Sequence, residues 1–210
     1  MDKHVNSISL TGTIAEMPSF SHEVKGVLFY VMMLDVPRRS GSHDLLPVMA
    51  SEQMLDSVSP EPGMALRVEG QLRSHNKAYD GKGRLVVTAF AQRLSVAVEC
   101  EKPNTVTLIG DLCKHPIYRT TPLGREITDM MIAINRPSRK SDYIPCIAWR
   151  HIAKFASTLA IGSRMSLEGR FQSRPYQKTL PDGTSIVRVA YEVSINSLHA
   201  EQNSNRRAIQ

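Results

Sequence analysis

The stretch NTVTLIGDLCKHP, residues 104–116, occurs in this chain in two versions, and the earlier one, NSISLTGTIAEMP, occupies residues 6–18. The register between them holds without a gap through Ala50 and Ala148, and 12 of those 45 residue pairs are identical. Self-similarity at a fixed spacing marks a repeated structural unit. The 210-residue chain therefore contains two copies of one fold, which we expect to meet near residues 99–104.

Within each copy, apolar and polar residues alternate with the period of two that is typical of β-strands. Residues 106–112 and 165–171 show this pattern, and residues 187–195 show it again near the end of the chain. A glycine stands in the middle of several of these segments, as at Gly110 and Gly169. Such a glycine is typical of a bulge or tight bend, which a small barrel needs in order to close.

One segment of each copy has the period of a helix instead. In the first copy this segment, residues 51–62, is stopped by Pro60 and Pro62. In the second copy, residues 150–161 place four apolar side chains on one helical face, namely Ile152, Phe155, Ala156 and Leu159.

A run of strands with one short helix between the third and fourth strands is typical of the OB fold, a five-stranded barrel. We therefore predict an all-β protein of two tandem OB barrels. The first domain is expected in residues 1–100, the second in 101–200, and a short disordered tail in 201–210.

The positive charge lies in one half of the chain. Residues 1–103 carry a net charge of −1, whereas residues 104–210 carry +7. A basic surface of this kind suits a polyanion, either nucleic acid or an anionic membrane, although a solvated surface explains the charge equally well.

The patterns of other chemistry are missing from the sequence. The seven histidines are dispersed without an HExxH motif, there is no phosphate-binding P-loop motif, and no nucleophile stands in a pattern with a base. The three cysteines, an odd number without CxxC spacing, argue against a disulfide framework or a zinc ribbon. We predict no enzyme, no metal and no cofactor, and a place in the reducing cytoplasm without membrane association.

In the segment YIPCIAW, residues 143–149, alternate residues belong to opposite faces of a predicted strand. Its alternate apolar residues stay small and apolar in the first copy, whereas Tyr143 and Trp149 are replaced there by Leu45 and Ser51. The two aromatic side chains are therefore not needed to close a barrel. We expect them to point outward, next to Arg150.

Three stretches of the second copy resemble the bacterial single-stranded DNA-binding protein family: NTVTLIGDL, YIPCIAW and GSRMSLEGRFQSR, within about residues 104–198. Residues 6–96 are similar more loosely and also resemble primosomal replication protein N. The resemblance implies sequence-independent binding and protection of single-stranded DNA in replication, recombination or repair. It also implies four OB domains per assembly, which two copies of this chain would supply as a homodimer.

The same resemblance places base-stacking aromatics at Tyr143, Trp149 and Tyr176, and neighbouring cations suit phosphates. The first repeat, with its lower charge and without these aromatics, is expected to bind DNA weakly or not at all. The predicted single-stranded DNA-binding residues are Tyr143, Trp149, Tyr176, Arg136, Arg139, Lys140, Arg150, Arg170, Arg174 and Lys178.

Other interpretations remain open at this point. Trp149 can instead lie in a subunit interface or make a core contact, and any single arginine can be solvated surface. The chain can be a primosomal or mobile-element replication accessory protein whose first OB domain binds a protein partner. It can also be an OB interaction module that contacts no nucleic acid. The expected partners are single-stranded DNA and replication proteins, at the nucleoid.

Overall fold

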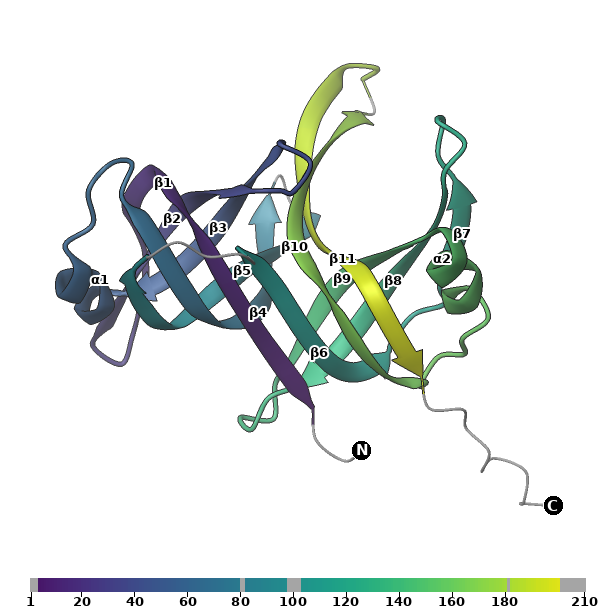
Figure 1. Cartoon of the computed structure of the whole chain (residues 1–210), viewed down its shortest axis with the longest axis horizontal. Coiled ribbons are helices and arrows are strands. Elements are labelled where there is room, and N and C mark those ends of the chain that lie inside the picture. Colours follow the sequence, from purple (N-terminus) through teal and green to yellow (C-terminus); the bar gives the residue numbers. More distant parts are fainter. Residues whose placement is uncertain (1–3, 80–81, 98–102, 181, 201–210) are drawn as a thin grey trace. The chain divides into compact units, whose positions relative to one another are not determined.

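The computed structural model describes residues 4–79, 82–97, 103–180 and 182–200, and these are almost entirely β-structure (Figure 1). The predicted tail, residues 201–210, lies outside the described residues. The functional division of the chain at residue 100 stays a prediction. The chain packs into two compact units. The N-terminal unit comprises Ser7–Val106 and Phe171–Glu192, and the C-terminal unit comprises Met1–Asn6, Thr107–Arg170 and Val193–Gln210.

The N-terminal unit is built on a closed five-stranded barrel. Its strands follow the order β2-β3-β5-β4-β1, and β1 also pairs with β2, which closes the sheet. The β3–β5 pairing is parallel, and β1–β4, β2–β3 and β4–β5 are antiparallel. The elements are β1 (Val5–Val24), β2 (Val27–Pro37), β3 (His43–Ser51), α1 (Glu52–Val58), β4 (Ala65–Tyr79) and β5 (Lys82–Val96).

The second repeat closes in the same way. Its strands follow the order β6-β10-β11-β9-β8, and β6 also pairs with β8, while the short β7 adds an extra strand beside β8. The predicted all-β fold with two OB barrels is thus confirmed. The elements are β6 (Asn104–Leu112), β7 (Ile117–Thr120), β8 (Glu126–Asn135), β9 (Ser141–Trp149), α2 (Arg150–Ala156), β10 (Arg164–Thr179) and β11 (Ser185–Ala200).

The glycines within the strands allow neighbouring strands to approach closely. A Cβ on Gly12 would lie 2.5 Å from the carbonyl oxygen of Asp35, and one on Gly110 would lie 2.6 Å from that of Ala133. Both distances are shorter than real Cβ contacts allow. Gly70 also adjoins a register shift between β4 and β5, in agreement with the bulge predicted for such positions.

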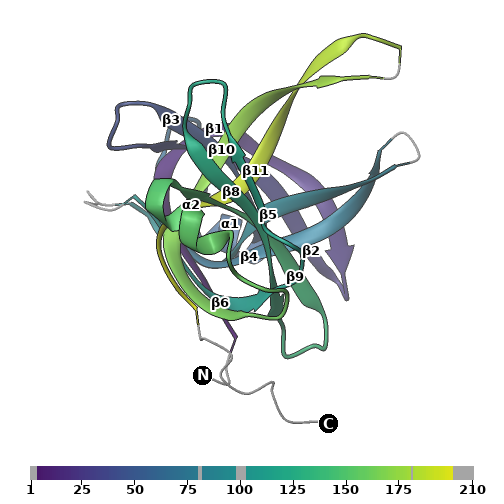
Figure 2. The ribbon, with the colours of Figure 1, turned by 90° about the vertical axis from the view of Figure 1, so that its right-hand side faces the viewer.

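The helix of the second repeat is shorter than its periodicity predicts. α2 ends at Ala156, and its buried residues are Ala153 and Ala156, whereas Phe155 is 42% exposed. The prediction that Phe155 lies on the buried face is therefore wrong. Small residues face inward because α2 lies close on β8, where the Thr128 hydroxyl donates to the carbonyl oxygen of Ala153 at 2.8 Å (Figure 2). Neither helix in the described part of the chain is long and apolar enough to cross a membrane.

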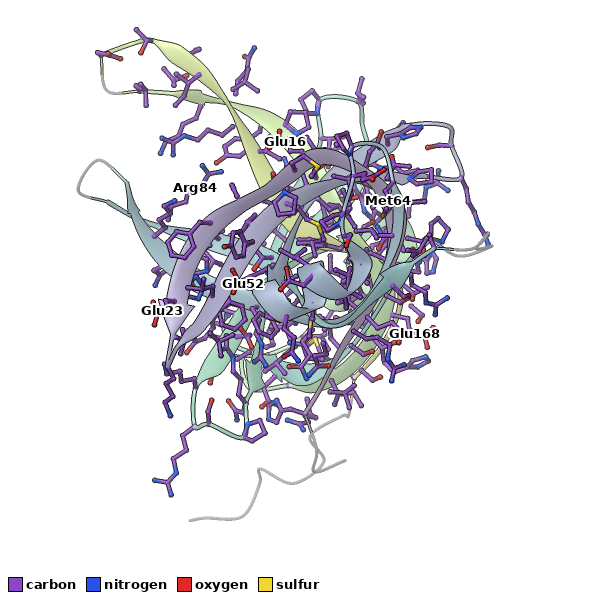
Figure 3. The ribbon with its side chains drawn as sticks, turned by 90° about the vertical axis from the view of Figure 1, so that its left-hand side faces the viewer. Glu16, Glu23, Glu52, Met64, Arg84 and Glu168 are labelled. Carbon is purple, nitrogen blue, oxygen red and sulfur yellow. The ribbon has the colours of Figure 1, made fainter. Side chains whose placement is uncertain are left out.

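The hairpin of residues 171–192 packs within the N-terminal unit. The backbone N–H of Ser173 donates to Asp44 Oδ1 at 2.8 Å, and Arg84 donates to the carbonyl oxygen of Val189 at 2.7 Å (Arg84 is labelled in Figure 3). The segment around Tyr176, which is loop-like in sequence, is a strand, because β10 continues to Thr179. These bonds hold the hairpin to the unit at both of its strands.

Candidate nucleic-acid interface

Strand β9 divides its side chains between the barrel interior and the outer surface. Ile144, Cys146 and Ala148 are buried to at least 98%, as predicted for interior positions. Tyr143 is 46% exposed, and Trp149, which shares its strand face, is half-buried. Tyr143 and Trp149 thus share one face of β9, six residues apart, and Ile147 between them on that face is buried.

A single hydrogen bond fixes the orientation of Trp149. Its indole N–H donates to Ser194 Oγ on β11 at 3.1 Å, and Ser194 is itself buried. This bond lies at the edge of the indole ring and does not use the π-faces. Sequence reasoning missed Ser194, because a serine between Val193 and Ile195 fits the alternation of polar and apolar residues in this strand and gives no separate signal.

Helix α2 of the second repeat lacks a side-chain N-cap, because Trp149 stands at its N-cap position. In the first repeat, Ser51 is the N-cap of α1 and accepts a hydrogen bond from the backbone N–H of Met54 at 3.4 Å. Trp149 is the N-cap of α2 and makes no such bond. A serine cap contributes about 1 kcal/mol. Helix stability therefore does not explain the tryptophan at this position.

Two exposed arginines flank β9 in left-handed backbone. Arg139 precedes the strand with φ of 61°, and Arg150 follows it with φ of 53°. The first repeat has Gly41 at the place of Arg139, where glycine avoids a cost of about 1–2 kcal/mol. Strained residues of this kind concentrate at functional sites. The second repeat thus places positive charge at both ends of β9 despite the conformational cost.

Arg136, a predicted phosphate contact, already has a carboxylate partner. Its Nε donates to Asp142 Oδ2 at 2.6 Å, its Nη2 donates to Oδ1, and Asp142 is fully buried. Arg38 and Asp44 form the same pair in the first repeat. A pair that recurs in both barrels has a structural role, and a role of Arg136 in DNA binding stays a prediction.

Three predicted residues lie in the N-terminal unit, on the later part of β10. Arg174 donates to both carboxylate oxygens of Glu192, at 2.9 and 3.0 Å, and Glu192 also accepts from Gln172 at 2.9 Å. Tyr176 is half-buried and Lys178 is exposed. The guanidinium of Arg174 is thereby held against a buried carboxylate.

The C-terminal unit brings most of the predicted residues to β9 and its ends. Exposed Lys140 lies next to Arg139 before the strand, and half-buried Arg170 lies on β10. Aromatic rings offer stacking surfaces to unpaired bases, and arginine and lysine bind phosphates. The surface formed by Tyr143, Trp149, Arg139, Lys140 and Arg150 is called the β9 surface below.

Several known proteins resemble the second repeat. The sequence model of the Single-strand binding protein family matches residues 103–200. Single-stranded DNA-binding protein 3 of Listeria innocua serovar 6a is 33% identical over 107 residues, covering 48% of this chain and 66% of the relative. Single-stranded DNA-binding protein 1 of Staphylococcus aureus (strain COL) is 33% identical over 114 residues, covering 50% of this chain and 68% of the relative. The chain thus spans about two thirds of the length of these relatives.

The fold extends the likeness to the whole chain. The structure of the wild-type single-stranded DNA binding protein from Thermus aquaticus has a TM-score of 0.74 and 21% sequence identity, and the match covers 98% of this chain and 97% of that one. The chain belongs to the single-strand binding protein family.

Proposed function

We propose that this protein binds single-stranded DNA without reading its sequence and protects it during replication, recombination or repair. Bases would stack on Trp149 and Tyr143, and phosphates would lie against Arg139, Lys140 and Arg150. The second repeat would supply most of the affinity. Names of the curated relatives support this binding, and nothing in the β9 surface calls for a catalytic step.

One observation carries the proposal. The second repeat places an aromatic ring and two cations where the first repeat has a capping serine, a glycine and an acidic residue, namely Ser51, Gly41 and Glu52. Each change at Ser51 and Gly41 lowers the stability of the local backbone. Binding of a ligand by these side chains would offset that cost.

Fluorescence anisotropy with labelled oligo-dT, a mixed-sequence single strand and the matching duplex tests the proposal. We expect the two single strands to bind with similar affinity and the duplex to bind far more weakly, because a paired base offers no free π-face. Equal binding of duplex and single strand would mean that only charge is recognised, and the proposal would fail.

Replacing Arg139 by glycine is expected to change stability and binding in opposite directions. Arg139→Gly removes a left-handed non-glycine residue, so the free energy of unfolding should rise by about 1 kcal/mol. It also removes one phosphate contact, so the slope of log affinity against log salt should fall by about 0.7. Urea unfolding and salt titrations measure the two effects. Arg139→Lys, which keeps charge and strain, should change neither, and an unchanged salt slope in the glycine variant would exclude Arg139 from the interface.

A homodimer would present four barrels around a two-fold axis, and we propose this assembly. Light scattering at micromolar concentration should give about twice the chain mass of 23.4 kDa. A mass of one chain would reject the dimer. The bacterial relatives support a place in the cytoplasm, as do the three cysteines, which are odd in number and lack CxxC spacing. Replication proteins would be further partners.

A further inference from the structure

We infer that the first repeat carries its own base-stacking surface, built on Phe29 and Phe90 instead of the positions that carry aromatics in the second repeat. This inference rests on the proposed function, since it assigns the same class of ligand, single-stranded nucleic acid, to a second place on the chain. It also explains how a repeat without Trp149 and Tyr143 can contribute to binding.

The first argument is an exchange across one pair of strands. A constant offset of 98 residues equates Phe29 with Ile127, and Ser51 with Trp149. Phe29 lies opposite Ser51 in the β2–β3 pairing, and Ile127 lies opposite Trp149 in the β8–β9 pairing. Both repeats therefore have one aromatic side chain in this cross-strand pair, but on opposite strands.

The neighbouring strand continues the exchange. Val48 pairs with Ala89 as Cys146 pairs with Val193, so Phe90 takes the place of Ser194. In the second repeat, Ser194 holds the indole of Trp149. In the first repeat, the rings of Phe29 and Phe90 approach each other to 5.6 Å between centroids. Two phenylalanines thus occupy the place of one tryptophan and its hydrogen-bonding serine.

These two rings form the centre of a row of planar groups. His22 on β1 stacks on Phe29 with a centroid distance of 5.3 Å and an interplanar angle of 16°. The guanidinium carbon of Arg73 on β4 lies 5.7 Å from the ring centroid of Phe90. We call His22, Phe29, Phe90 and Arg73 the aromatic row. His22 is exposed, and the other three are half-buried.

The aromatic row lies on the outside of the barrel. Along β2, Met32 and Leu34 are buried, and the unbroken β2–β3 register puts Phe29 on the opposite face. Ala89 pairs with Leu72, and both are fully buried, so that Phe90 also points away from the interior. The row is therefore not part of the core.

The charges around the row favour a polyanion. Arg73 lies over the Phe90 ring, and His75, two residues further along β4, lies near His22 and Lys77. Burial lowers the pKa of His75, and the positive charges of His22 and Lys77 lower it further. Stacked aromatic rings beside arginine and lysine suit bases joined by phosphates, and arginine over a ring adds a cation–π contribution. A purely apolar protein partner would gain nothing from these cations.

Full-length variants test the inference, and each takes the residue that the second repeat has at the equivalent place. Phe29→Ile and Phe90→Ser should lower the affinity for an oligo-dT of about 40 nucleotides roughly tenfold, by anisotropy. An oligo-dT of about 10 nucleotides, which one OB fold can cover, should quench Trp149 as in the unmodified protein. Val96→Ala, at a residue that is 59% exposed on β5, is the control and should change neither reading.

The two readings separate this inference from the proposed function. Unchanged affinity for the long oligonucleotide in a folded Phe29→Ile protein would overturn the aromatic row as a DNA contact. If Trp149 in the unmodified protein responds to neither oligonucleotide, the role proposed for Trp149 fails. A loss of long-oligonucleotide binding in Phe29→Ile would then still support the row. Thermal unfolding shows whether Phe90→Ser remains folded, and Phe29→Ile decides the question if it does not.

Discussion

Arg136→Ala should lower the free energy of unfolding by about 3–5 kcal/mol. The substitution removes the guanidinium that balances the carboxylate of Asp142, which is fully buried in the second barrel. A buried charge that loses its counter-charge carries most of its desolvation penalty without compensation. Urea or thermal unfolding followed by circular dichroism measures the loss.

Two variants control this experiment. Arg38→Ala should also lower stability, because Arg38 and Asp44 form the same pair in the first barrel, where Asp44 keeps the hydrogen bond from the Ser173 backbone N–H. Lys140→Ala removes a nearby exposed cation and should leave stability unchanged within about 0.5 kcal/mol. A folded Arg136→Ala protein of normal stability that binds oligo-dT weakly would assign Arg136 to the DNA interface instead, as the sequence analysis predicts.

Trp149→Ala is expected to reduce affinity for single-stranded DNA by about 1–3 kcal/mol, the usual range for loss of one stacked base. The indole is half-buried and held by Ser194, so stability should also fall by about 1 kcal/mol through the lost hydrogen bond. Anisotropy titration with oligo-dT gives the affinity, and urea unfolding gives the stability.

Trp149→Ser separates these two effects. Serine at this N-cap position can accept a backbone N–H of α2 as Ser51 does in α1, which offsets about 1 kcal/mol of the lost stability. We therefore expect Trp149→Ser to unfold near the unmodified protein and to bind as weakly as Trp149→Ala. Early unfolding of both variants with normal binding would place Trp149 in a structural contact and reject stacking.

The repeat and the strand periodicity predicted the fold because they depend on residues that face the barrel interior. Leu108 and Leu10 occupy equivalent buried positions, and Gly110 and Gly12 make equivalent close approaches. Helix α2 was predicted too long because Phe155 and Leu159 continue an apolar period, whereas packing on β8 admits only small residues such as Ala153.

The candidate site could be predicted only where a residue of one repeat could be compared with the residue at the equivalent position of the other repeat. Comparing Trp149 with Ser51 indicated the aromatic residue that the second repeat adds, but the same comparison concealed Phe29, which lies on the neighbouring strand of the first repeat. Exchange between paired strands becomes visible only when the register is known. The left-handed backbone of Arg139 was likewise hidden, although Gly41 at the equivalent place indicates it once the structure is seen.

The most direct test follows the fluorescence of Trp149, the single tryptophan of the chain, while oligo-dT is added to the unmodified protein at several salt concentrations. Stacking on the β9 surface predicts saturable quenching, with log affinity falling linearly with log salt by about 0.7 for each phosphate contact. Fluorescence that stays constant at low salt, up to oligonucleotide concentrations that saturate binding by anisotropy, would contradict the account.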